Sequence, residues 1–450
     1  MMNRILLLGA GRSATVLIDY LLSHAVEFNA TVSVGDQSAE AAADKVGNNA
    51  AGRAIAFDAL DEVQRKSEIE AHDVVISMLP PHLHILVAKD CLSCKKHLIT
   101  ASYVSPELQL LNEEVKKAGL LFMCEMGLDP GIDHMSAMQL IHDIQGRGGR
   151  ITSFKSGTGG LVAPESDDNP WHYKVTWNPR NVVLAGQNTA QYLDRGVQKF
   201  VPYHRLFSHT EKFKIKGLGK YESYPNRDSL SYISKYGLEG VETILRSTLR
   251  KEGYCEAWDA LVQLGLTDDS YTLNGLKKMT YAGWVNCYLP EKAKWEGRSV
   301  KSKVAKLLDL EPAVLHRLEW LGLFSDDNIG IESGTPAEVL QDLLVRRWKM
   351  QPTDNDMIVM RHEIQYTLED KSHEHISTMV LKGEDAQRTA MAKTVGLPMG
   401  IMVRLLLQSE IFLTGVHIPV MSQVYNPVLK ELSSLGIAFD GEEKALQKEH

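Results

Sequence analysis

The stretch Arg4-Ile5-Leu6-Leu7-Leu8-Gly9-Ala10-Gly11-Arg12-Ser13-Ala14, close to the first residue, decides the fold. Its apolar run over residues 5–8 is typical of a central parallel strand that is buried on both faces. The six residues that follow have the G-x-G-x-x-A form of the fingerprint with which a strand, a tight turn and a helix bind a dinucleotide. We therefore predict a strand over 5–8 and a helix over 12–23, with a pyrophosphate at the start of that helix.

Each position of this fingerprint has its own part in holding a pyrophosphate. Gly9 permits the tight turn, Gly11 lets the backbone come close to the phosphates, and Ala14 lets the helix pack closely against the strand. Phosphate oxygens then accept hydrogen bonds from the free N–H groups at the positive end of the helix. The candidate residues of this loop are Gly9, Gly11, Arg12, Ser13 and Ala14.

A second strand and an acidic residue support the cofactor site. Thr31-Val32-Ser33-Val34 predicts the strand, and Asp36 follows it near the usual spacing of roughly 20 residues for the acid that accepts both ribose hydroxyls. The alternative is a glycine turn in another α/β protein, with Asp36 as a solvated loop residue. The order strand, turn, helix, strand and acid favours the cofactor site. Because a carboxylate repels a 2′-phosphate, Asp36 favours NAD over NADP, although Arg12 could still reach a phosphate.

The bulk properties are those of a globular enzyme. A chain of 450 residues should form two or three domains, and 44% hydrophobic with 24% charged residues is ordinary for a soluble protein. The net charge of −8 argues against nucleic acid as a partner. We expect no leader and no membrane span, because no uninterrupted apolar run approaches ~20 residues. Five cysteines, sparse and odd in number, do not fit a disulfide framework, so we expect a cytoplasmic enzyme.

The pattern after Asp36 continues as a doubly wound parallel sheet. Further strands are predicted at 54–57, 73–81, 97–103 and 120–123, with helices near 39–50, 60–70, 82–94 and 105–118. The strand at 73–81 is expected to end in a loop at its two prolines. Ligands bind beyond the carboxyl ends of such strands, which places the loops that follow them on a rim facing the cofactor. The candidate cofactor residues on and beside this rim are Asp58, Ser77, Met78, Leu79, Ala101, Ser102, Leu128 and Asp129.

The alternation of strand and helix stops near residue 150. A β-rich region is predicted over 151–250, with strands at 151–156, 173–177, 181–186, 198–203 and 211–216, and a helical region over 251–330. Strands return at 357–364 and 375–381. A long helix is predicted over 390–413, interrupted near Gly396-Leu397-Pro398, and the last ten or so residues are expected to fray.

Several long motifs go beyond a generic nucleotide-binding protein. They are ASYVSP at 101–106, GLDPGIDH at 127–134, GGLVAPES at 159–166 followed by DNP at 168–170, YKVTW at 173–177, YPNRDS at 224–229, STLR at 247–250 and AMAKTVG at 390–396. Together, over nearly the whole chain, they resemble the saccharopine dehydrogenases of the L-glutamate-forming type.

That resemblance implies an architecture and a reaction. A nucleotide domain would span 1–130 and be completed by 388–450, a mixed α/β substrate and dimerisation domain would span 131–250 and 331–387, and an all-helical insertion would span 251–330. Saccharopine, a secondary amine that joins the lysine side chain to the α-carbon of glutarate, would be oxidised with a nicotinamide cofactor to L-glutamate and α-aminoadipate 6-semialdehyde, or formed by the reverse condensation. The resemblance further implies a homodimer that acts on small molecules in lysine metabolism.

A substrate with three carboxylates requires cations. Arg227 is the first candidate because its planar guanidinium matches a carboxylate bidentately, and a structural pair with Asp228 is the alternative. Arg250 is a second candidate, whereas Lys174 is expected to be solvated. The resemblance adds Thr248 and Leu249 as substrate-binding residues and Thr176 as a cofactor-binding residue.

Proton transfer needs titratable groups beside the nicotinamide. Asp129 lies on the predicted rim and Tyr103 ends the fifth strand, and the resemblance places both, with Ser102, in the substrate pocket. Asp129 could orient the amine or act as base if burial raises its pKa, and the alternative is that it caps a helix beginning near Pro130-Gly131. One departure matters. Gly157-Thr158-Gly159-Gly160 stands where the family reads Tyr-Cys-Gly-Gly, and threonine has no group that titrates near neutrality.

Other histidines and cysteines receive ordinary interpretations. Cys91 and Cys94 form one C-x-x-C without a second pair, so no metal or redox site is expected. His82 and His84 are expected to cover the nicotinamide ribose or to cap a helix, and His134 to be a structural histidine. Two rival functions stay open: a carboxyspermidine-type dehydrogenase that condenses an amine with an aldehyde, and a nucleotide-binding regulator without activity.

Overall fold

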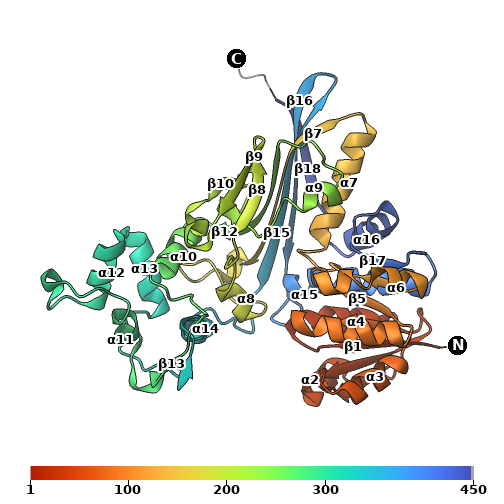
Figure 1. Cartoon of the computed structure of the whole chain (residues 1–450), viewed down its shortest axis with the longest axis horizontal. Coiled ribbons are helices and arrows are strands. Elements are labelled where there is room, and N and C mark those ends of the chain that lie inside the picture. Colours follow the sequence, from red (N-terminus) through yellow and green to blue (C-terminus); the bar gives the residue numbers. More distant parts are fainter. Residues whose placement is uncertain (1, 447–450) are drawn as a thin grey trace. The chain divides into compact units, whose positions relative to one another are not determined.

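The computed structural model describes residues 2–446, which fold into two compact units. Unit 1 contains Met1–Ile151 and Tyr366–His450, and unit 2 contains Thr152–Gln365. Figure 1 labels the helices and strands of both units. This division into two units does not test the three domains expected from the family resemblance, which stay a prediction.

Unit 1 is built on a parallel sheet that has seven strands in the described part of the chain. The strands are β1 (Asn3–Leu8), β2 (Ala30–Asp36), β3 (Gly52–Ala56), β4 (Val74–Ser77), β5 (His97–Thr100), β6 (Leu121–Met123) and β17 (Gly415–His417). Their order is β17-β6-β5-β4-β1-β2-β3, and the run from β3 to β6 is the doubly wound order of dinucleotide-binding sheets. Residues 5–8 are 0% exposed, as expected for a central strand. The predicted Rossmann sheet is therefore confirmed.

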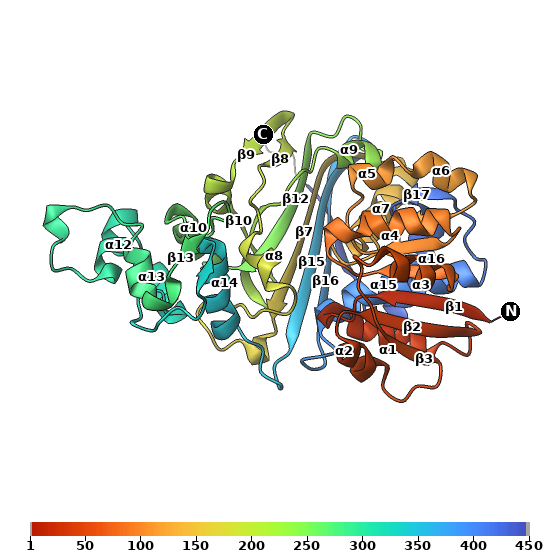
Figure 2. The same cartoon turned by 60° about the horizontal axis from the view of Figure 1, so that its bottom comes forward.

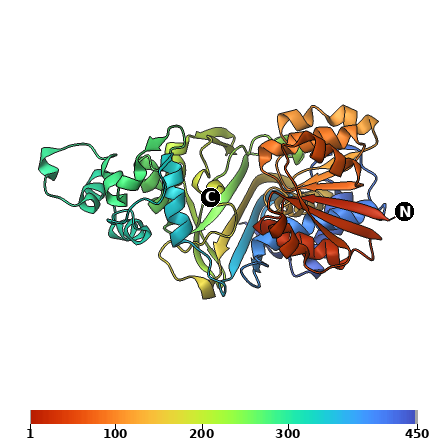
Figure 3. The ribbon, with the colours of Figure 1, turned by 90° about the horizontal axis from the view of Figure 1, so that it is seen from below.

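Helices lie on both faces of this sheet, above and below the strands in the view of Figure 3. They are α1 (Thr15–Ser23), α2 (Ala39–Val46), α3 (Glu62–Glu70), α4 (His84–Ser93), α5 (Pro106–Gln109), α6 (Asn112–Lys117), α7 (Ile132–Gly146), α15 (Ala390–Leu407) and α16 (Ser422–Ser434). The first four agree with the predicted helices to within a few residues. The single helix expected over 105–118 forms as two short ones, α5 and α6.

Helix α15 packs against α1 within unit 1. A Cβ on Gly396 would lie 2.9 Å from the backbone nitrogen of Leu17, so glycine permits the close approach. The expected interruption near 396–398 is wrong, because the helix accommodates Pro398 in its interior. The expected end at 413 is also wrong, since the helix ends at Leu407. In the described part of the chain, α15 alone is long and apolar enough to cross a membrane, and 72% of it is buried within the structure, as in a core helix.

Unit 2 is built on a mixed sheet. Its strands are β7 (Arg150–Val162), β8 (Ala190–Asp194), β9 (Val197–Val201), β10 (Glu211–Ile215), β11 (Gly219–Pro225), β12 (Thr243–Lys251) and β15 (Asp356–Leu368), the first and last of which carry the chain across the boundary of the unit. The sheet order is β10-β11-β12-β7-β15. The β10–β11 and β11–β12 pairs are antiparallel, and the β12–β7 pair is parallel. Figure 2 shows β12, β7 and β15 side by side. This sheet confirms the mixed α/β part of the predicted fold class.

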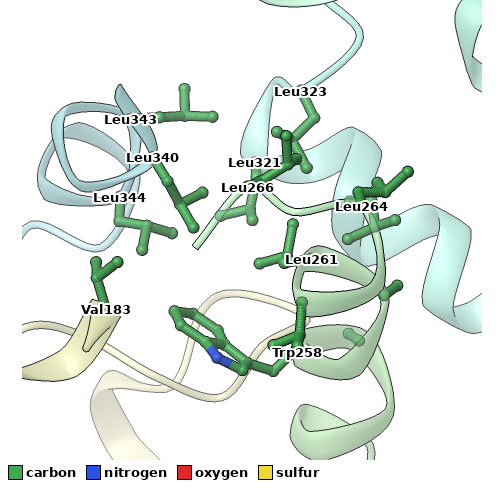
Figure 4. Close-up of a cluster of buried hydrophobic side chains, with 14 of the residues drawn as sticks. Val183, Trp258, Leu261, Leu264, Leu266, Leu321, Leu323, Leu340, Leu343 and Leu344 are labelled. Atoms are coloured by element: carbon green, nitrogen blue, oxygen red, sulfur yellow. The ribbon is translucent and has the colours of Figure 1, made fainter. Parts of the chain in front are cut away.

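Helices and large aromatic side chains form the core of unit 2. The helices are α8 (Pro179–Val183), α9 (Tyr232–Lys235), α10 (Tyr254–Gln263), α11 (Tyr281–Asn286), α12 (Val300–Leu308), α13 (Pro312–Leu321) and α14 (Pro336–Arg347). Trp258 stacks on Tyr254 and on Trp348, with ring centroids 5.6 and 6.1 Å apart. Figure 4 shows leucines of α10, α13 and α14 around Trp258. Helices α10 to α13 confirm the predicted helical character of 251–330.

Two predicted strands in the β-rich region are wrong. Residues 181–183 lie in α8 and residues 184–186 form the turn after it. The Asn178 side chain accepts from the Arg180 N–H and Pro179 occupies the first helical position, and these two helix-start signals override the β-branched valines. Residues 173–177 form no strand in the described structure. Val175 makes an isolated bridge with Lys349, and Tyr173 and Val175 belong to the apolar core of unit 2.

The predicted frayed end is also wrong over the residues that the structure describes. β18 (Asp440–Ala445) pairs antiparallel with β16 (Lys371–Lys382) in unit 1, because the backbone of β16 supplies hydrogen-bond partners over its length. Residues 447–450 lie outside the described residues. Strand β16 itself agrees with the strand predicted at 375–381.

Candidate active site

The fingerprint loop after β1 has room for a pyrophosphate. Gly9 has φ +103°, and a Cβ there would lie 3.0 Å from the Met78 carbonyl oxygen, so this turn requires glycine. No described atom lies within 4 Å of the place that a Cβ on Gly11 would take, so the space beside its backbone is open. Arg12 begins a 3₁₀ turn that continues into α1, and Ala14 is buried. The first N–H groups of this helical run lack intrahelical acceptors and fit the phosphates of a dinucleotide.

Asp36 ends β2 with its carboxylate directed at this loop. Oδ2 accepts a hydrogen bond from the Ala10 N–H at 2.7 Å, and Oδ1 accepts one from the Ser38 N–H at 2.9 Å. Half-buried and held at two points, Asp36 is not the solvated loop residue of the alternative interpretation. Its place at the end of the second strand agrees with the predicted position of an acid for the ribose hydroxyls. Asp58 is exposed after β3, and its Oδ1 accepts from the Leu60 N–H in a local turn.

Lys45 on α2 belongs to the same loop, although the sequence did not single it out. Its Nζ donates to the Gly11 carbonyl at 2.6 Å and to Thr15 Oγ1 at 2.7 Å. Burial lowers the pKa of Lys45, and the nearby Asp36 and Asp19 oppose that effect. A lysine on a surface helix carries no sequence signal that distinguishes it from a solvated one.

The loops after β5 and β6 meet in unit 1 and bring the candidate catalytic pair together. A Cβ on Gly127 would lie only 2.9 Å from the Cβ of Ala101, so the two loops touch. The Tyr103 O–H donates to Asp129 Oδ1 at 3.3 Å. Leu128, beside Asp129, is buried. Tyr103 and Asp129 can therefore act on the same group of a ligand.

The helix-capping alternative for Asp129 is wrong. Helix α7 begins at Ile132 with Gly131 as its N-cap, and the Gly131 N–H donates to Asp133 Oδ1 at 2.6 Å. A Cβ on Gly131 would lie 2.0 Å from the Gly127 carbonyl oxygen, so the turn requires glycine there. Asp133, the second residue of the helix, makes this contact with the Gly131 N–H.

A buried pair of side chains supports both loops. His134 Nε2 lies 2.7 Å from Glu125 Oε2, with the two side chains 0% and 1% exposed. Glu125 Oε1 accepts from the Val104 N–H at 3.2 Å, and the Glu125 N–H donates to the Ser102 carbonyl at 3.0 Å. The prediction that His134 is structural is confirmed. Glu125 was missed, and an acid within the otherwise apolar stretch 120–128 was its one signal.

His84 joins the loops after β4 and β5. Its Nδ1 lies 2.8 Å from Ser77 Oγ and its Nε2 lies 2.7 Å from Ser102 Oγ. His84 is buried and does not cap α4, whose N-cap is Leu83, whereas His82 is exposed. The other rim residues after β4 are the half-buried Met78 and Leu79.

Arg250 in unit 2 is a buried cation. It is 4% exposed on β12, and its guanidinium lies 5.1 Å from the ring centroids of Tyr173 and Tyr254 and 5.9 Å from that of Tyr224. Nη1 donates to the Leu249 carbonyl at 2.9 Å, whereas Nε has no hydrogen-bond partner among the described residues. No described carboxylate pairs with Arg250, although buried charges in proteins are paired as a rule. Arg250 therefore fits a residue that binds an anionic group of a ligand.

Two threonines accompany Arg250. Thr158 and Thr248 are paired neighbours on β7 and β12, and alternation along β12 places Thr248 and Arg250 on one face. The Thr158 hydroxyl is buried without a hydrogen-bond partner among the described residues. Leu249 points to the opposite face, into an apolar cluster with Tyr221 and Val359.

Arg227 is exposed in the loop after β11, in a left-handed conformation with φ +50°. The Oδ1 atom of Asp228, its suggested structural partner, accepts from the N–H groups of Leu230 and Ser231 at 2.8 and 3.3 Å. Arg227 stays a candidate for binding a carboxylate of the substrate.

Lys174 was expected to be solvated, but it is buried. It is 3% exposed and pairs with Asp168 at 2.8 Å and with Asp354 at 2.7 Å, so two carboxylates neutralise it. Thr176, two residues on, is buried. The described residues contain no group of three or more His, Cys, Asp or Glu side chains that could hold a metal ion.

The candidate residues fall into two groups according to the unit that carries them. Those in unit 1 are Gly9, Gly11, Arg12, Ser13, Ala14, Asp36, Asp58, Ser77, Met78, Leu79, Ala101, Ser102, Tyr103, Leu128 and Asp129, and those in unit 2 are Thr176, Arg227, Thr248, Leu249 and Arg250. Their roles stay predictions, to which the geometry within each unit adds the contacts described above.

Comparison with known proteins covers almost the whole chain. Residues 5–123 match the family described as saccharopine dehydrogenase NADP binding domain, and residues 127–437 match the saccharopine dehydrogenase C-terminal domain. The saccharopine dehydrogenase (NADP(+), L-glutamate-forming) of Schizosaccharomyces pombe is 33% identical over 450 residues, which are 98% of this chain and 99% of the relative. The apo structure of the L-Glu forming enzyme from Saccharomyces cerevisiae aligns with a TM-score of 0.87 and 31% identity over 99% of this chain and 100% of that one.

Some relatives are much longer. The alpha-aminoadipic semialdehyde synthase of Arabidopsis thaliana is 34% identical over 403 residues, which are 85% of this chain but only 38% of that protein. The chain thus spans less than half the length of such a relative. The two matched domains, the fingerprint with Asp36 and the full-length fold are consistent with one another, and unit 1 is a nicotinamide dinucleotide-binding unit. The chain belongs to the saccharopine dehydrogenase family.

Proposed function

We propose that this chain oxidises saccharopine with a nicotinamide cofactor to L-glutamate and α-aminoadipate 6-semialdehyde, and catalyses the reverse reductive condensation. Membership of the family supports the reaction, and one observation carries it to this chain. Arg250 is a buried guanidinium that no described carboxylate neutralises. A substrate with three carboxylates supplies the missing anion.

The surroundings of Arg250 favour a carboxylate ligand. Three tyrosine rings stabilise the guanidinium by cation–π contacts, yet an unpaired buried cation still costs several kcal/mol. A carboxylate offsets that cost because its oxygens accept from Nε and from the hydroxyls of Thr158 and Thr248. In this proposal Arg227 binds a second carboxylate from its exposed loop.

The groups of unit 1 handle the proton. A nicotinamide cofactor held by the fingerprint loop would supply the hydride acceptor for the carbon that becomes the aldehyde. Because glutamate keeps the bridging nitrogen, that carbon is the terminal side-chain carbon of the lysine part. Asp129 takes the proton of the bridging nitrogen while Tyr103 holds the carboxylate through its O–H. Water then adds to the new C=N bond, and the C–N bond breaks as the nitrogen gains a proton, so that glutamate leaves.

Thr158 does not take part in proton transfer in this scheme. Its hydroxyl does not titrate near neutrality, so a cysteine-based acid or base is not available at this position. The proton steps therefore fall to Asp129 and to water.

We further propose that the chain prefers NAD to NADP. The Ala10 and Ser38 N–H groups hold the Asp36 carboxylate at the end of β2, beside the fingerprint loop, where this proposal places the ribose hydroxyls. A 2′-phosphate there would meet a like charge, and two unit charges ~5 Å apart at an effective dielectric constant of ~20 repel by about 3 kcal/mol. The matching family domain and the Schizosaccharomyces pombe relative are named for NADP, so the preference proposed here differs from the cofactor in those names.

The test is saccharopine oxidation followed by nicotinamide absorbance, with NAD and NADP in parallel. A kcat/KM at least tenfold higher with NAD supports both proposals. Reduction of NADP alone keeps the reaction and refutes the Asp36 argument. Cofactor binding without reduction favours the nucleotide-binding regulator, and turnover of carboxyspermidine in place of saccharopine favours the amine-specific rival.

The homodimer and the cytoplasmic location expected from the sequence stay predictions. Light scattering after size-exclusion chromatography tests the first, and fluorescence of a tagged chain in its host tests the second.

A further inference from the structure

Ser77, His84 and Ser102 form a hydrogen-bonded chain at the carboxyl edge of the parallel sheet in unit 1. Ser77 Oγ lies 2.8 Å from His84 Nδ1, and His84 Nε2 lies 2.7 Å from Ser102 Oγ. Ser77 is 0% exposed and His84 is 5% exposed, whereas Ser102 is half-buried. One end of the chain is therefore closed, and the other lies on the rim with the candidate substrate residues.

The charge of His84 limits where the protons of these two hydrogen bonds can lie. Burial, and to a smaller extent His82, lowers the pKa of His84 to about 4, so the ring is neutral at neutral pH. A neutral imidazole donates through one nitrogen and accepts through the other, whereas a hydroxyl can do both. The hydrogen bonds therefore run either from Ser77 to Ser102 or from Ser102 to Ser77.

The closed end selects one of these directions. Among the described residues, His84 Nδ1 is the sole hydrogen-bond partner of Ser77 Oγ. If Nδ1 carried the ring proton, the Ser77 O–H would be left in buried surroundings without an acceptor, which is costly. If Ser77 instead donates to Nδ1, its proton is satisfied and the ring proton lies on Nε2. His84 then donates to Ser102 Oγ.

We propose that Ser77 and His84 are positioning residues that make Ser102 a hydrogen-bond donor to a carboxylate oxygen of the bound substrate. With Nε2–H donating to Ser102 Oγ, the proton of Ser102 is directed to an acceptor outside the chain. Three donors aligned in one direction polarise one another, which strengthens the last bond. A carboxylate is the acceptor that gains most from it, and this identification of the acceptor rests on the proposed function.

The position of the ring proton is a direct test. Long-range ¹H–¹⁵N correlation spectra of protein labelled with ¹⁵N-histidine distinguish the protonated from the unprotonated ring nitrogen, and the His84→Gln variant assigns the signals. We expect a protonated Nε2 and an unprotonated Nδ1. A protonated Nδ1 overturns the proposal. Because this readout needs neither substrate nor turnover, it separates a failure of this inference from a failure of the proposed function.

Ser77→Ala tests the consequence for binding. The variant removes the first donor of the chain, so KM for saccharopine should rise about three- to tenfold while kcat changes less than about twofold. Ser77→Thr keeps the hydroxyl and should restore KM. Ser33→Ala is the matched control, because Ser33 Oγ makes a buried 2.8 Å hydrogen bond to His72 Nε2 in the same sheet.

Two kinetic outcomes overturn the proposal. An unchanged KM for saccharopine in a Ser77→Ala variant shows that substrate binding by Ser102 does not depend on its hydrogen bonds to His84 and Ser77. Thermal unfolding checks that the variant is folded. An equal rise of KM in Ser33→Ala shows a general loosening of the sheet. If the wild-type protein does not oxidise saccharopine, the proposed function fails, and the ring proton alone decides whether Ser102 is a donor.

Discussion

Replacing Arg250 by methionine separates a binding role from a structural one. The variant loses the contacts of the guanidinium with three tyrosine rings at 5.1, 5.1 and 5.9 Å, each worth about 0.5–1 kcal/mol. It also loses the desolvation cost of an unpaired buried cation, which is several kcal/mol. The two effects oppose each other, so we expect the free energy of unfolding to fall by less than about 1 kcal/mol or to rise.

Saccharopine binding should respond very differently to the same change. A buried charge pair between guanidinium and carboxylate contributes about 2–5 kcal/mol, so kcat/KM should fall by about 30-fold or more. The assays are urea unfolding and initial rates of cofactor reduction. Lys174→Met is the matched control, since it leaves Asp354 buried without its cation and should cost about 3 kcal/mol of stability. An Arg250→Met variant that is destabilised as much as the control but keeps its affinity for saccharopine would refute the argument.

Three further substitutions address the other assigned roles. Asp36→Ser removes the like charge beside a 2′-phosphate, so the ratio of kcat/KM for NADP to that for NAD should rise about tenfold or more in initial-rate measurements, and an unchanged ratio would place the ribose elsewhere. Asp129→Asn keeps the shape of the side chain but cannot take a proton, so kcat should fall about 100-fold or more with KM little changed, and a normal kcat would exclude Asp129 as the base. Thr158→Cys should leave kcat within about twofold at neutral pH if Asp129 and water move the protons, whereas a large rise in kcat would show that a thiol is the better acid or base here.

The sheet of unit 1 could be predicted from the sequence because most of its strands carry sequence signals within a few residues of the strand itself. The buried run at 5–8, the glycines after it and the acid after β2 are all short-range signals. Strand β17 could not be found in this way, because it has three residues and joins β6 from almost 300 positions away. β18 was missed for another reason: all its side chains are exposed, so no apolar alternation marks it. Its backbone pairing with β16 and the ion pair between Lys444 and Glu374 form only in the folded chain.

The candidate site was predicted where a residue's chemistry shows in its own neighbourhood. Asp36 is the last residue of β2 and Asp129 lies in the loop after β6, so both lie at the carboxyl ends of strands as predicted. Lys174 was misjudged, because its partners Asp168 and Asp354 come together only in the folded chain. His84 illustrates the same limit, since its role depends on two serines from different strands.

Backbone strain beside the candidate catalytic pair has a specific cause. Glu125 is a non-glycine residue with φ +57°, a conformation that costs about 1 kcal/mol or more. Glycine would relieve the strain but would remove the carboxylate that accepts from the Val104 N–H and contacts His134 of α7. One residue thus ties the loop that carries Tyr103 to the helix that follows Asp129. The cost of this backbone conformation is therefore offset by the two contacts through which the buried Glu125 carboxylate holds both loops.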